Sequence, residues 1–401
     1  MTVESATTAF EHPAAVTWDG AREHAYATAV PLPPRTVSLA DAAGAVLAAP
    51  LVAPAAVPPV DRSAMDGYAV RGRAPWTVLG TVRAGSRVVP ALAPGEACAI
   101  VTGAAVPPGS DAVLPDEDAV RTGDELTGAV AAGRHIRRAG EECTAGEALV
   151  PAGAVVGPPV LGLAATLGCD TLLVHPLPRM AAFVTGDELL DHGPPGPGRV
   201  RDAIGPMLPG LVSRAGARLA GTTRLPDTRP ALLDALELAD ADVLLVSGSS
   251  AAGPADHLRA VLTDLGADLV VDGVACRPGH PQTLALLPGG RLVVGLPGNP
   301  LAALVAFLTL GVPVIAGLRG ERLRPLLAVP VPGGVERHPS STRLVPVRVG
   351  PHGAEAVGHA GAAMLRGAAL ADALAVVDPG PAAAIAARLL PLDPGAQPWG
   401  V

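Results

Sequence analysis

Acidic side chains in turn or loop contexts are the first candidates for chemistry in this sequence. Thr185-Gly186-Asp187-Glu188 directly follows an apolar run, so two carboxylates stand at the end of a predicted strand. Asp187 could simply cap the next element. A capping role explains Glu188 less well. The other acids in turn or loop contexts are Asp66, Glu142, Asp227 and Asp256. If several converge, they would bind a hard cation such as Mg²⁺, although sequence spacing does not show that they converge.

Two further predicted strands end in small or rigid residues. Ser247-Gly248-Ser249 follows an apolar run, and its small side chains let backbone amides approach a ligand before a helix expected to begin at Pro254. This loop resembles a phosphate cradle, and an ordinary Gly/Ser turn is the alternative. Pro297-Gly298-Asn299 forms a rigid turn that either starts a helix or belongs to a site. Ligands of open parallel sheets bind beyond the carboxyl ends of the strands, where these turns are expected.

Cations and small turns complete the candidates. Arg277 and His280 flank a Pro-Gly turn, and such a pair could hold an oxyanion. Arg137 belongs to a run of cations between residues 134 and 138. Solvated side chains are the alternative interpretation for both. Asp66 precedes Gly67, which alone would indicate a hairpin turn, and Thr102-Gly103-Ala104 follows later in the same region.

The composition excludes several classes of function. All 29 basic residues of the 401-residue chain are arginines, which rules out a lysine Schiff base and a lysine-containing P-loop. Because the net charge is −8 and aromatic residues make up only 2% of the chain, no nucleic-acid partner is expected. The cysteines match neither zinc-ligand spacing nor a dense disulfide framework, which suits a reducing cytoplasm.

No membrane partner is expected either. The first residues lack the basic and apolar regions of a secretory signal. Leu301 to Leu318 approaches the length of a membrane span, but it contains Gly311 and Pro313 and follows a tight turn. We therefore expect this stretch to be a buried helix of a protein without a membrane segment.

The elements that position the candidates are predicted to form a multidomain α/β protein. Residues 178–322 alternate strand and helix patterns, which is the βαβ rhythm of a doubly wound α/β domain with a parallel sheet. The expected strands are Met180–Val184, Arg218–Thr222, Val243–Val246 and Leu292–Val294, and the expected helices are Met207–Ala215, Pro230–Ala239, His257–Leu265 and Leu301–Ile315. A dehydrogenase is not expected, because no Gly-x-Gly-x-x-Gly motif opens a helix after a strand.

Three further parts are predicted around this domain. Residues 1–50 together with 151–177 are expected to form a helical N-terminal and linker domain, with helices over Ala21–Thr28, Leu39–Ala48 and Val160–Leu167. Residues 51–150 are short Val- and Ala-rich segments broken by Gly or Pro, which is typical of a β-rich domain. Residues 323–401 show a similar pattern and predict a C-terminal β-barrel-like domain.

Four motif blocks, in order, resemble those of the molybdopterin molybdenumtransferases, the family of MoeA and the gephyrin E domain. The resemblance extends from Trp18-Asp19-Gly20-Ala21-Arg22 to the terminal strands. The blocks are Ser63-Ala64-Met65-Asp66-Gly67-Tyr68-Ala69, Thr102-Gly103-Ala104 through Pro108-Gly109-Ser110-Asp111-Ala112-Val113, Thr185-Gly186-Asp187-Glu188-Leu189, and Leu296-Pro297-Gly298-Asn299-Pro300.

The resemblance implies an elongated subunit in which an α/β domain of the MogA and MoaB type has β-rich domains at both sides. It implies an antiparallel homodimer whose sites form between the α/β domain of one subunit and the β-rich domain of the other. The implied reaction uses Mg²⁺, inserts molybdate into adenylated molybdopterin and releases AMP in the cytoplasm. Other molybdenum-cofactor biosynthesis proteins would be further partners.

The resemblance also implies residue roles. The catalytic residues would be Asp66, Thr102, Glu142, Glu188 and Asp256, and the metal ligands would be Asp66, Glu188, Asp227 and Asp256. Substrate-binding residues would be Thr185, Gly186, Ser247, Gly248, Ser249, Pro297, Gly298, Asn299, Arg137, Arg277, His280 and Arg343. This division is physically reasonable, because a molybdate dianion that approaches a pterin phosphate needs cations nearby and a carboxylate-held metal at the phosphoanhydride.

Two non-catalytic alternatives stay open from the sequence. A divergent paralogue could bind a pterin or a nucleotide without turnover. A dimeric scaffold is the other alternative, because the gephyrin branch uses this dimer as a receptor-binding platform, although nothing in the sequence indicates a peptide partner.

Overall fold

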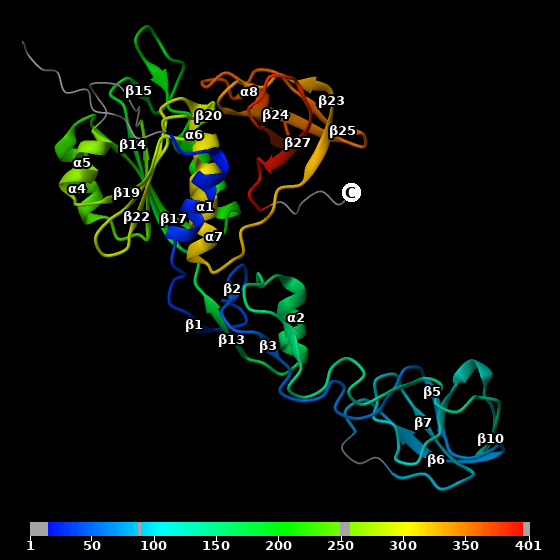
Figure 1. Cartoon of the computed structure of the whole chain (residues 1–401). Helices are drawn as coiled ribbons and strands as arrows, with labels where there is room; N and C mark the ends of the chain where they lie inside the picture. Colours follow the sequence, from blue (N-terminus) through cyan, green and yellow to red (C-terminus); the bar gives the residue numbers. More distant parts are fainter. Residues whose placement is uncertain (1–14, 87–89, 249–256, 396–401) are drawn as a thin grey trace, which may run out of the picture. The chain divides into compact units, whose positions relative to one another are not determined.

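The computed structural model describes residues 15–86, 90–248 and 257–395, which form two compact units (Figure 1). The first unit takes the described residues of Met1–Arg35, Gly44–Ala48 and Val174–Val401. The second takes those of Thr36–Ala43 and Ala49–Leu173. The candidate residues are therefore divided between the units: Asp66, Thr102, Arg137 and Glu142 belong to the second, and the other described candidates belong to the first.

A six-stranded sheet forms the centre of the first unit, in the order β17-β14-β18-β22-β21-β19. Its strands are β14 (Arg179–Thr185), β17 (Arg218–Leu225), β18 (Val243–Ser247), β19 (Asp268–Asp272), β21 (Thr283–Leu286) and β22 (Leu292–Leu296). The four predicted strands, β14, β17, β18 and β22, are confirmed and run parallel. The predicted parallel pairing holds for these four strands but not for the whole sheet, because β21 runs antiparallel to both β22 and β19. Pro288-Gly289-Gly290 makes the turn between β21 and β22, with a positive φ at both glycines.

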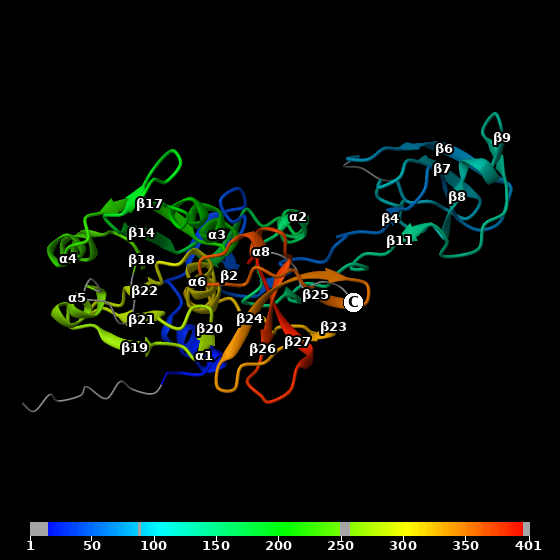
Figure 2. The same ribbon diagram turned by 90° about the horizontal axis from the view of Figure 1, so that it is seen from above.

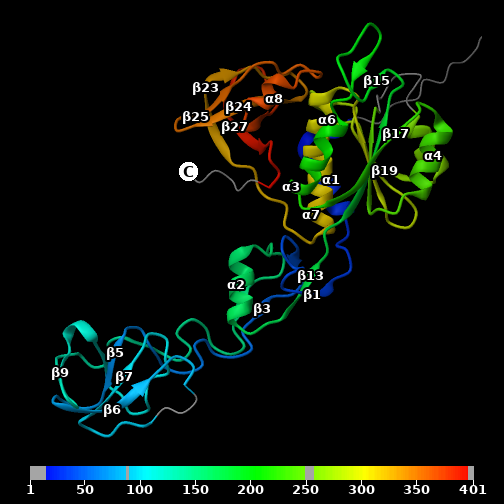
Figure 3. The same ribbon diagram turned by 180° about the vertical axis from the view of Figure 1, so that it is seen from behind.

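Helices cover both faces of this sheet (Figures 1, 2 and 3). Helices α4 (Arg229–Leu238) and α5 (Leu258–Asp264) lie on one face, and α1 (Trp18–Thr28), α3 (Leu208–Arg214), α6 (Pro300–Ala306) and α7 (Val312–Leu318) lie on the other. Alternation along β18 explains the arrangement: Val243 and Leu245 join the core with α1, whereas Leu244 and Val246 join the core with α4 and α5. The doubly wound α/β architecture is therefore confirmed.

The long apolar helix is part of the protein core. A π-helical turn, η3 (Phe307–Gly311), joins α6 to α7, and 94% of the most apolar window of Pro300–Leu318 is buried. The stretch is long and apolar enough to cross a membrane, but its burial confirms the predicted core helix. Pro313 cannot donate the π-type hydrogen bond to the Leu308 carbonyl. Arg22 of α1 donates to that carbonyl instead, at 3.2 Å.

A second sheet of the first unit runs in the order β20-β24-β26-β27-β23, with β25 paired to β24. Its strands are β20 (Cys276–Arg277), β23 (Ala328–Val335), β24 (Thr342–Gly350), β25 (Gly353–Ala356), β26 (Ala373–Val377) and β27 (Ala384–Pro391), and α8 (Arg366–Ala369) lies between β25 and β26 in the chain. Leu344, Leu374 and Val376 of this sheet belong to the same core cluster as Met180 and Val243. The two sheets of the first unit thus share one core.

The second unit is rich in short strands. Its six-stranded sheet has the order β8-β5-β7-β6-β10-β9. These strands are β5 (Gly67–Val70), β6 (Trp76–Val82), β7 (Glu96–Ile100), β8 (Ala112–Pro115), β9 (Val120–Thr122) and β10 (Glu125–Thr127), with η1 (Asp116–Asp118) as a 3₁₀ turn. The shorter pairs are β4 (Arg62–Ser63) with β11 (Ile136–Arg137) and β3 (Leu51–Val52) with β12 (Ala148–Val150). Helix α2 (Pro158–Thr166) confirms the helix predicted around Val160–Leu167.

Two local predictions are wrong. Leu39–Ala48 forms a turn and strand β2 (Val46–Leu47) instead of a helix, because Gly44 has a φ of +76° and Val46–Leu47 pairs with β13 (Thr171–His175). Strand β1 (Arg35–Ser38) also lies in the region expected to be helical. Asp66-Gly67 is not a hairpin turn, because β4 pairs with β11 whereas β5 pairs with β7 and β8. The four domain boundaries and the barrel-like form of residues 323–401 stay predictions.

Candidate active site

The ends of β14, β18 and β22 lie close together in the first unit, in the region where the sequence predicts a ligand site. The Thr185 hydroxyl, at the end of β14, donates to the Ser247 carbonyl at the end of β18, at 2.9 Å. Gly248 has a φ of +93°, and a Cβ there would overlap the Thr185 hydroxyl. A Cβ on Gly298, which follows β22, would lie 3.7 Å from the Gly248 Cα. The backbones of three predicted site loops therefore approach one another closely, and glycine at residue 248 permits this.

Glu188 stands in a tight turn directly after β14. The Leu189 amide donates to the Gly186 carbonyl at 3.2 Å, which closes a four-residue turn. Gly186 has a φ of +136°, and a Cβ there would lie 2.9 and 3.1 Å from the Glu188 carboxylate oxygens. The Glu188 carboxylate is therefore folded over the Gly186 Cα, in a position that a larger residue would obstruct.

Asp227 lies in the same group of acids. It follows β17, and its amide donates to Asp187 Oδ1 at 3.3 Å, so Asp187 joins the loop after β14 to the loop after β17. Burial raises the pKa of Asp227, and the nearby Asp187 and Glu188 carboxylates raise it further, whereas His257 opposes them. Crowded carboxylates destabilise each other's charged forms, and a cation between them relieves that repulsion.

Of the four predicted metal ligands, the described residues of the first unit contain Glu188 and Asp227. Asp66 belongs to the second unit, and Ser249, Pro254 and Asp256 lie outside the described residues. Within residues 15–86, 90–248 and 257–395, no group of three or more His, Cys, Asp or Glu side chains is arranged to hold a metal ion. Glu188 and Asp227 nevertheless suit Mg²⁺, which proteins often bind through one or two carboxylates, with waters and substrate phosphates completing its shell.

The turn Pro297-Gly298-Asn299 leads into α6. Two of the first backbone amides of this helix, which have no partner within the helix, donate to another part of the chain. Leu301 and Ala302 both donate to the Ala362 carbonyl, at 2.9 and 3.1 Å. Ala362 comes from the loop between β25 and α8. These two donors at the start of α6 are therefore taken by the protein itself.

Two arginines stand side by side at the junction of the two sheets. Strands β20 and β24 pair in parallel and make Arg277 and Arg343 register partners. Both line a cleft of about 480 Å³, together with Arg337 and His338. Arg277 also lines an adjoining hollow of about 400 Å³ with His280. We call these two spaces together the Arg277 cleft. It brings together Arg277, His280 and Arg343 as a candidate anion site.

Hydrogen bonds orient two of the cleft residues. His280 Nδ1 lies 2.8 Å from the Val274 carbonyl oxygen, so a proton on Nδ1 would bind there and leave Nε2 for another partner. Arg343 donates to the Glu336 carbonyl at 2.6 Å and lies 3.3 Å from its carboxylate. The Glu336 side chain is 89% exposed, so this ion pair is weak and leaves the cation largely available.

In the second unit, the motif block that contains Asp66 is in direct contact with the block that begins at Thr102. The Thr102 amide and hydroxyl both donate to Asp66 Oδ1, at 2.6 and 2.9 Å. These bonds, from the amide first and then from the hydroxyl, hold the pKa of Asp66 below its usual range. Gly103 donates to the Ser63 carbonyl at 2.8 Å, which ties the backbones of the blocks together. Asp66 is exposed and favours its ionised form, as a metal ligand would need to do.

A cleft of about 680 Å³ also opens in the second unit. Arg62 and Arg137 are register partners of β4 and β11, and both line this cleft with Glu141 and Glu142. Cations directly opposite each other on paired strands destabilise the pair unless charges of opposite sign lie nearby. Arg137 and Glu142 are thus brought to one cleft, while Asp66 is not among its lining residues.

Sequence reasoning missed three residues of these clefts, namely Arg62, Arg337 and His338. Arg62 could have been found from its place beside the Asp66 motif. Arg337 and His338 lie in the loop before β24, and their charged run Glu336-Arg337-His338 was the available signal. Only the pairing of β20 with β24 shows that this loop lies beside Arg277.

Comparison with known proteins identifies the family. The model of the MoeA N-terminal region, domains I and II, matches residues 16–168, and that of a probable molybdopterin binding domain matches residues 181–317. Molybdopterin molybdenumtransferase 2 of Mycobacterium tuberculosis is 38% identical over 301 residues, covering 68% of this chain and 72% of the relative. The chain belongs to the molybdopterin molybdenumtransferase family.

Further relatives agree. The molybdopterin molybdenumtransferase of a Nostoc species is 33% identical over 301 residues, covering 71% of this chain and 69% of that protein. The solved structure of a molybdopterin biosynthesis MoeA protein from Pyrococcus horikoshii matches with a TM-score of 0.78 and 25% identity, covering 94% of this chain and 99% of that chain. The resemblance drawn from the motifs is confirmed. The non-catalytic paralogue and scaffold alternatives are not favoured, because these curated relatives are named as transferases.

Proposed function

We propose that this chain inserts molybdate into adenylated molybdopterin and releases AMP. The main support is that one compact unit contains both the acids and the cations that such a reaction needs. The ends of β14, β18 and β22 stand beside the acids Glu188 and Asp227, and the Arg277 cleft supplies cations. Acids suit a metal-bound phosphoanhydride, and arginines suit an oxyanion.

Molybdate is proposed to bind in the Arg277 cleft. Arg277 and Arg343 are permanent cations on neighbouring strands, and an anion between them would offset their repulsion. His280 would offer Nε2 to the same anion, because its Nδ1 lies against the Val274 carbonyl. Holding the dianion in a fixed place reduces the cost of bringing it to the pterin.

The pterin nucleotide is proposed to lie along the three strand ends. Gly248 and Gly298 have no side chains of their own to fill this region, so that backbone amides can approach the phosphates. The remaining proposed contacts are Thr185, Ser247, Ser249, Pro297, Asn299 and, from the β-rich unit, Arg137.

Mg²⁺ is proposed to be held by Glu188 and Asp227 together with Asp66 and Asp256. When bound, this ion neutralises charge on the phosphoanhydride whose cleavage releases AMP. Asp66 is kept ionised by Thr102, and Glu142 is the remaining proposed catalytic acid. Glu188 is positioned for this task by its turn, because its carboxylate lies over Gly186 at the end of β14.

We also propose a cytoplasmic homodimer, in which Asp66 and Thr102 of one subunit act with Glu188 and Asp227 of the other. The support is the division of the candidate acids between two compact units of one chain. Other enzymes of molybdenum-cofactor biosynthesis are the proposed protein partners, and nucleic acid and membranes are not.

The reaction is tested with purified protein, Mg²⁺, molybdate and adenylated molybdopterin, by measuring AMP. We expect AMP release by the wild type and a loss of at least about 100-fold in Glu188→Gln, which removes one charge without changing size. Glu237→Gln is the matched control, because Glu237 is exposed on α4 on the surface of the same unit. Absence of release above that of heat-denatured protein would reject the proposal.

The shared site is tested by mixing two inactive variants, Asp66→Asn and Glu188→Gln. If subunits exchange freely, half of the dimers are mixed, and each mixed dimer has one intact site, so activity should return to roughly a quarter of the wild-type value. Co-purification of the untagged Glu188→Gln variant on an affinity tag carried by the Asp66→Asn variant is the control for exchange. No recovery despite demonstrated exchange would place both acids in a site within one chain.

A further inference from the structure

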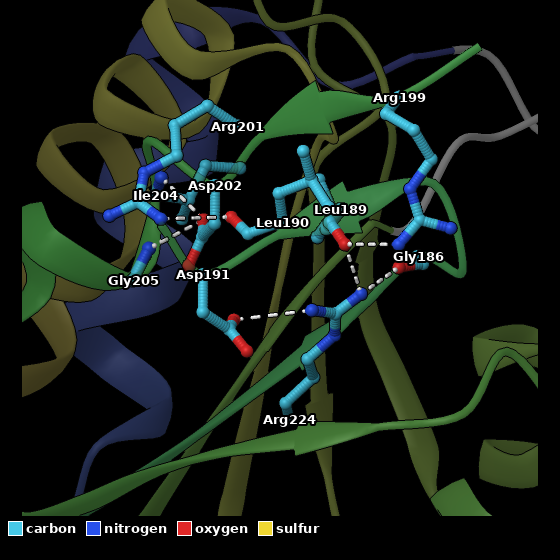
Figure 4. Close-up of polar contacts among 10 residues, drawn as sticks. All are labelled: Gly186, Leu189, Leu190, Asp191, Arg199, Arg201, Asp202, Ile204, Gly205 and Arg224. Atoms are coloured by element: carbon cyan, nitrogen blue, oxygen red, sulfur yellow. Dashed lines mark hydrogen bonds and ion pairs between the residues drawn. The ribbon is translucent and has the colours of Figure 1, made fainter. Parts of the chain in front are cut away.

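Arg224, which the sequence analysis did not single out, extends from β17 toward the turn that carries Glu188. Strands β14 and β17 pair in parallel, with Arg224 opposite Val184, two residues before Gly186. Figure 4 shows the guanidinium lying between Gly186, Leu189 and Asp191. The pairing of β17 with β14 therefore places the Arg224 guanidinium beside both ends of the turn that contains Glu188.

The guanidinium makes three contacts there. Arg224 Nη2 donates to the Gly186 carbonyl at 3.1 Å and to the Leu189 carbonyl at 2.5 Å. Nη1 lies 3.2 Å from Asp191 Oδ1 (Figure 4). Gly186 and Leu189 are the first and last residues of the turn that contains Glu188. One nitrogen, Nη2, thus connects both ends of that turn, while Nη1 of the same planar group lies beside Asp191.

The turn is held from its other side by a short parallel pair. Strands β15 (Leu189–Leu190) and β16 (Val200–Arg201) pair there, and the Val200 amide donates to the Glu188 carbonyl at 2.9 Å. Arg199 and Arg201 donate to the carbonyls of Leu189 and Leu190. Asp202 accepts the amides of Ile204 and Gly205, which fixes the end of the segment before η2 (Gly205–Met207) (Figure 4). The Glu188 backbone is therefore fixed on both sides.

We propose that Arg224 is a positioning residue that fixes the Glu188 carboxylate for metal binding by holding the carbonyls at both ends of its turn. This inference rests on the proposed role of Glu188 and extends it to a residue that does not touch substrate or metal. The ion pair with Asp191 contributes little, because its side chains are 34% and 60% exposed. The carbonyl contacts carry the effect, because they act on the backbone that presents Glu188.

The first test measures AMP release against Mg²⁺ concentration in Arg224→Met, Arg224→Lys and the control Arg218→Met. Removing a group that orients a metal ligand typically weakens metal binding by about 10- to 100-fold, so half-saturating Mg²⁺ should rise by at least about tenfold in Arg224→Met. Arg224→Lys should show a smaller rise, because an ammonium keeps a cation with several N–H donors at this place. Arg218 lies exposed on the same strand, and Arg218→Met should leave the value unchanged.

This measurement separates positioning from simple loss of folded protein. A smaller folded fraction lowers the rate at every Mg²⁺ concentration but does not move the half-saturation point. An unchanged half-saturation in Arg224→Met would overturn the proposal, as would an equal rise in Arg218→Met.

The second test follows hydrogen exchange of the unliganded protein and does not depend on catalysis. The amides of Leu189 and Val200 should exchange faster in Arg224→Met than in the wild type, while the amides of β22 should not change. If the wild type released no AMP, the proposed function would fail, and this exchange experiment would still decide whether Arg224 holds the turn. Equal exchange at Leu189 in both proteins would then overturn the inference.

Discussion

The amide and the hydroxyl of Thr102 donate to the same carboxylate oxygen of Asp66, at 2.6 and 2.9 Å. This double contact joins two motif blocks that are far apart in the sequence. It favours the charged form of Asp66, since both donors bind the ionised oxygen more strongly than the protonated one. The contact therefore predicts how activity should respond to acid.

Replacing Thr102 with Val should move the acid limb of activity to higher pH. The variant loses the hydroxyl donor and keeps the amide, so the depressed pKa of Asp66 rises part of the way toward its usual range. A larger fraction of Asp66 is then protonated at a given acidic pH. Thr102→Ser keeps the hydroxyl and should retain the wild-type profile. Superimposable pH–rate profiles for Thr102→Val and the wild type would contradict this explanation.

Gly248→Ala should force apart the ends of β14 and β18. The added methyl would overlap the Thr185 hydroxyl, and φ is +93° there, so we expect a destabilisation of about 1–3 kcal/mol and an activity loss of at least about tenfold. Gly221→Ala, on exposed β17 with open space around it, is the matched control. Urea unfolding and AMP release measure the two effects. Wild-type values for both in Gly248→Ala would show that the close approach is unimportant.

Asp227→Asn should stabilise the metal-free protein at neutral pH. Because burial and the Asp187 and Glu188 carboxylates raise the pKa of Asp227, the folded state prefers its protonated form. That preference stabilises the protein below the unfolded pKa and is lost as pH rises through the folded value. An amide avoids the loss, so the Tm of Asp227→Asn should exceed that of the wild type at pH 7.5, and the difference should shrink toward pH 4.

Adding Mg²⁺ should reverse this order. Binding stabilises the folded wild type, whereas Asp227→Asn lacks one ligand and should gain less. Asp268→Asn, at an exposed position on β19, serves as the control and should follow the wild type with and without Mg²⁺. A Tm of Asp227→Asn below the wild-type value at pH 7.5 without Mg²⁺ would refute the repulsion argument.

Arg22→Met should destabilise the first unit by about 1–3 kcal/mol. Arg22 is buried against Trp18, with its guanidinium 5.0 Å from the ring centroid, and it donates to the Leu308 carbonyl that Pro313 cannot serve. Methionine fills similar space but leaves that carbonyl without its donor. Arg35→Met, at an exposed position, should stay within about 0.5 kcal/mol of the wild type in urea unfolding. An unaffected Arg22→Met would mean that the carbonyl finds another donor.

The sequence predicted the parallel strands well because their signals are local. Met180–Val184 and Val243–Val246 are short apolar runs between helix patterns, and they are strands in the structure. The helix expected over Leu39–Ala48 failed because Gly44 adopts a positive φ and Val46 pairs with His175, which lies far away in the sequence. β21 was missed because its short apolar run lacks a helix pattern on either side.

The candidate site was predictable where motif and strand end coincide. Glu188, Ser247 and Gly298 each follow an apolar run, and their proximity follows from parallel order. Arg224 and Arg337 were not predictable, because their roles depend on which residues of neighbouring strands or loops lie side by side. No periodicity within one segment contains that information.

The Ala362 carbonyl that accepts the first two amides of α6 has a practical consequence. A fragment cut out as the α/β part alone would have bare donors at one end of its central helix and would expose the aliphatic surface that Leu344, Leu374 and Val376 cover. Such a fragment should precipitate or melt early. A fragment prepared for molybdopterin-binding measurements should therefore include the second sheet of the first unit.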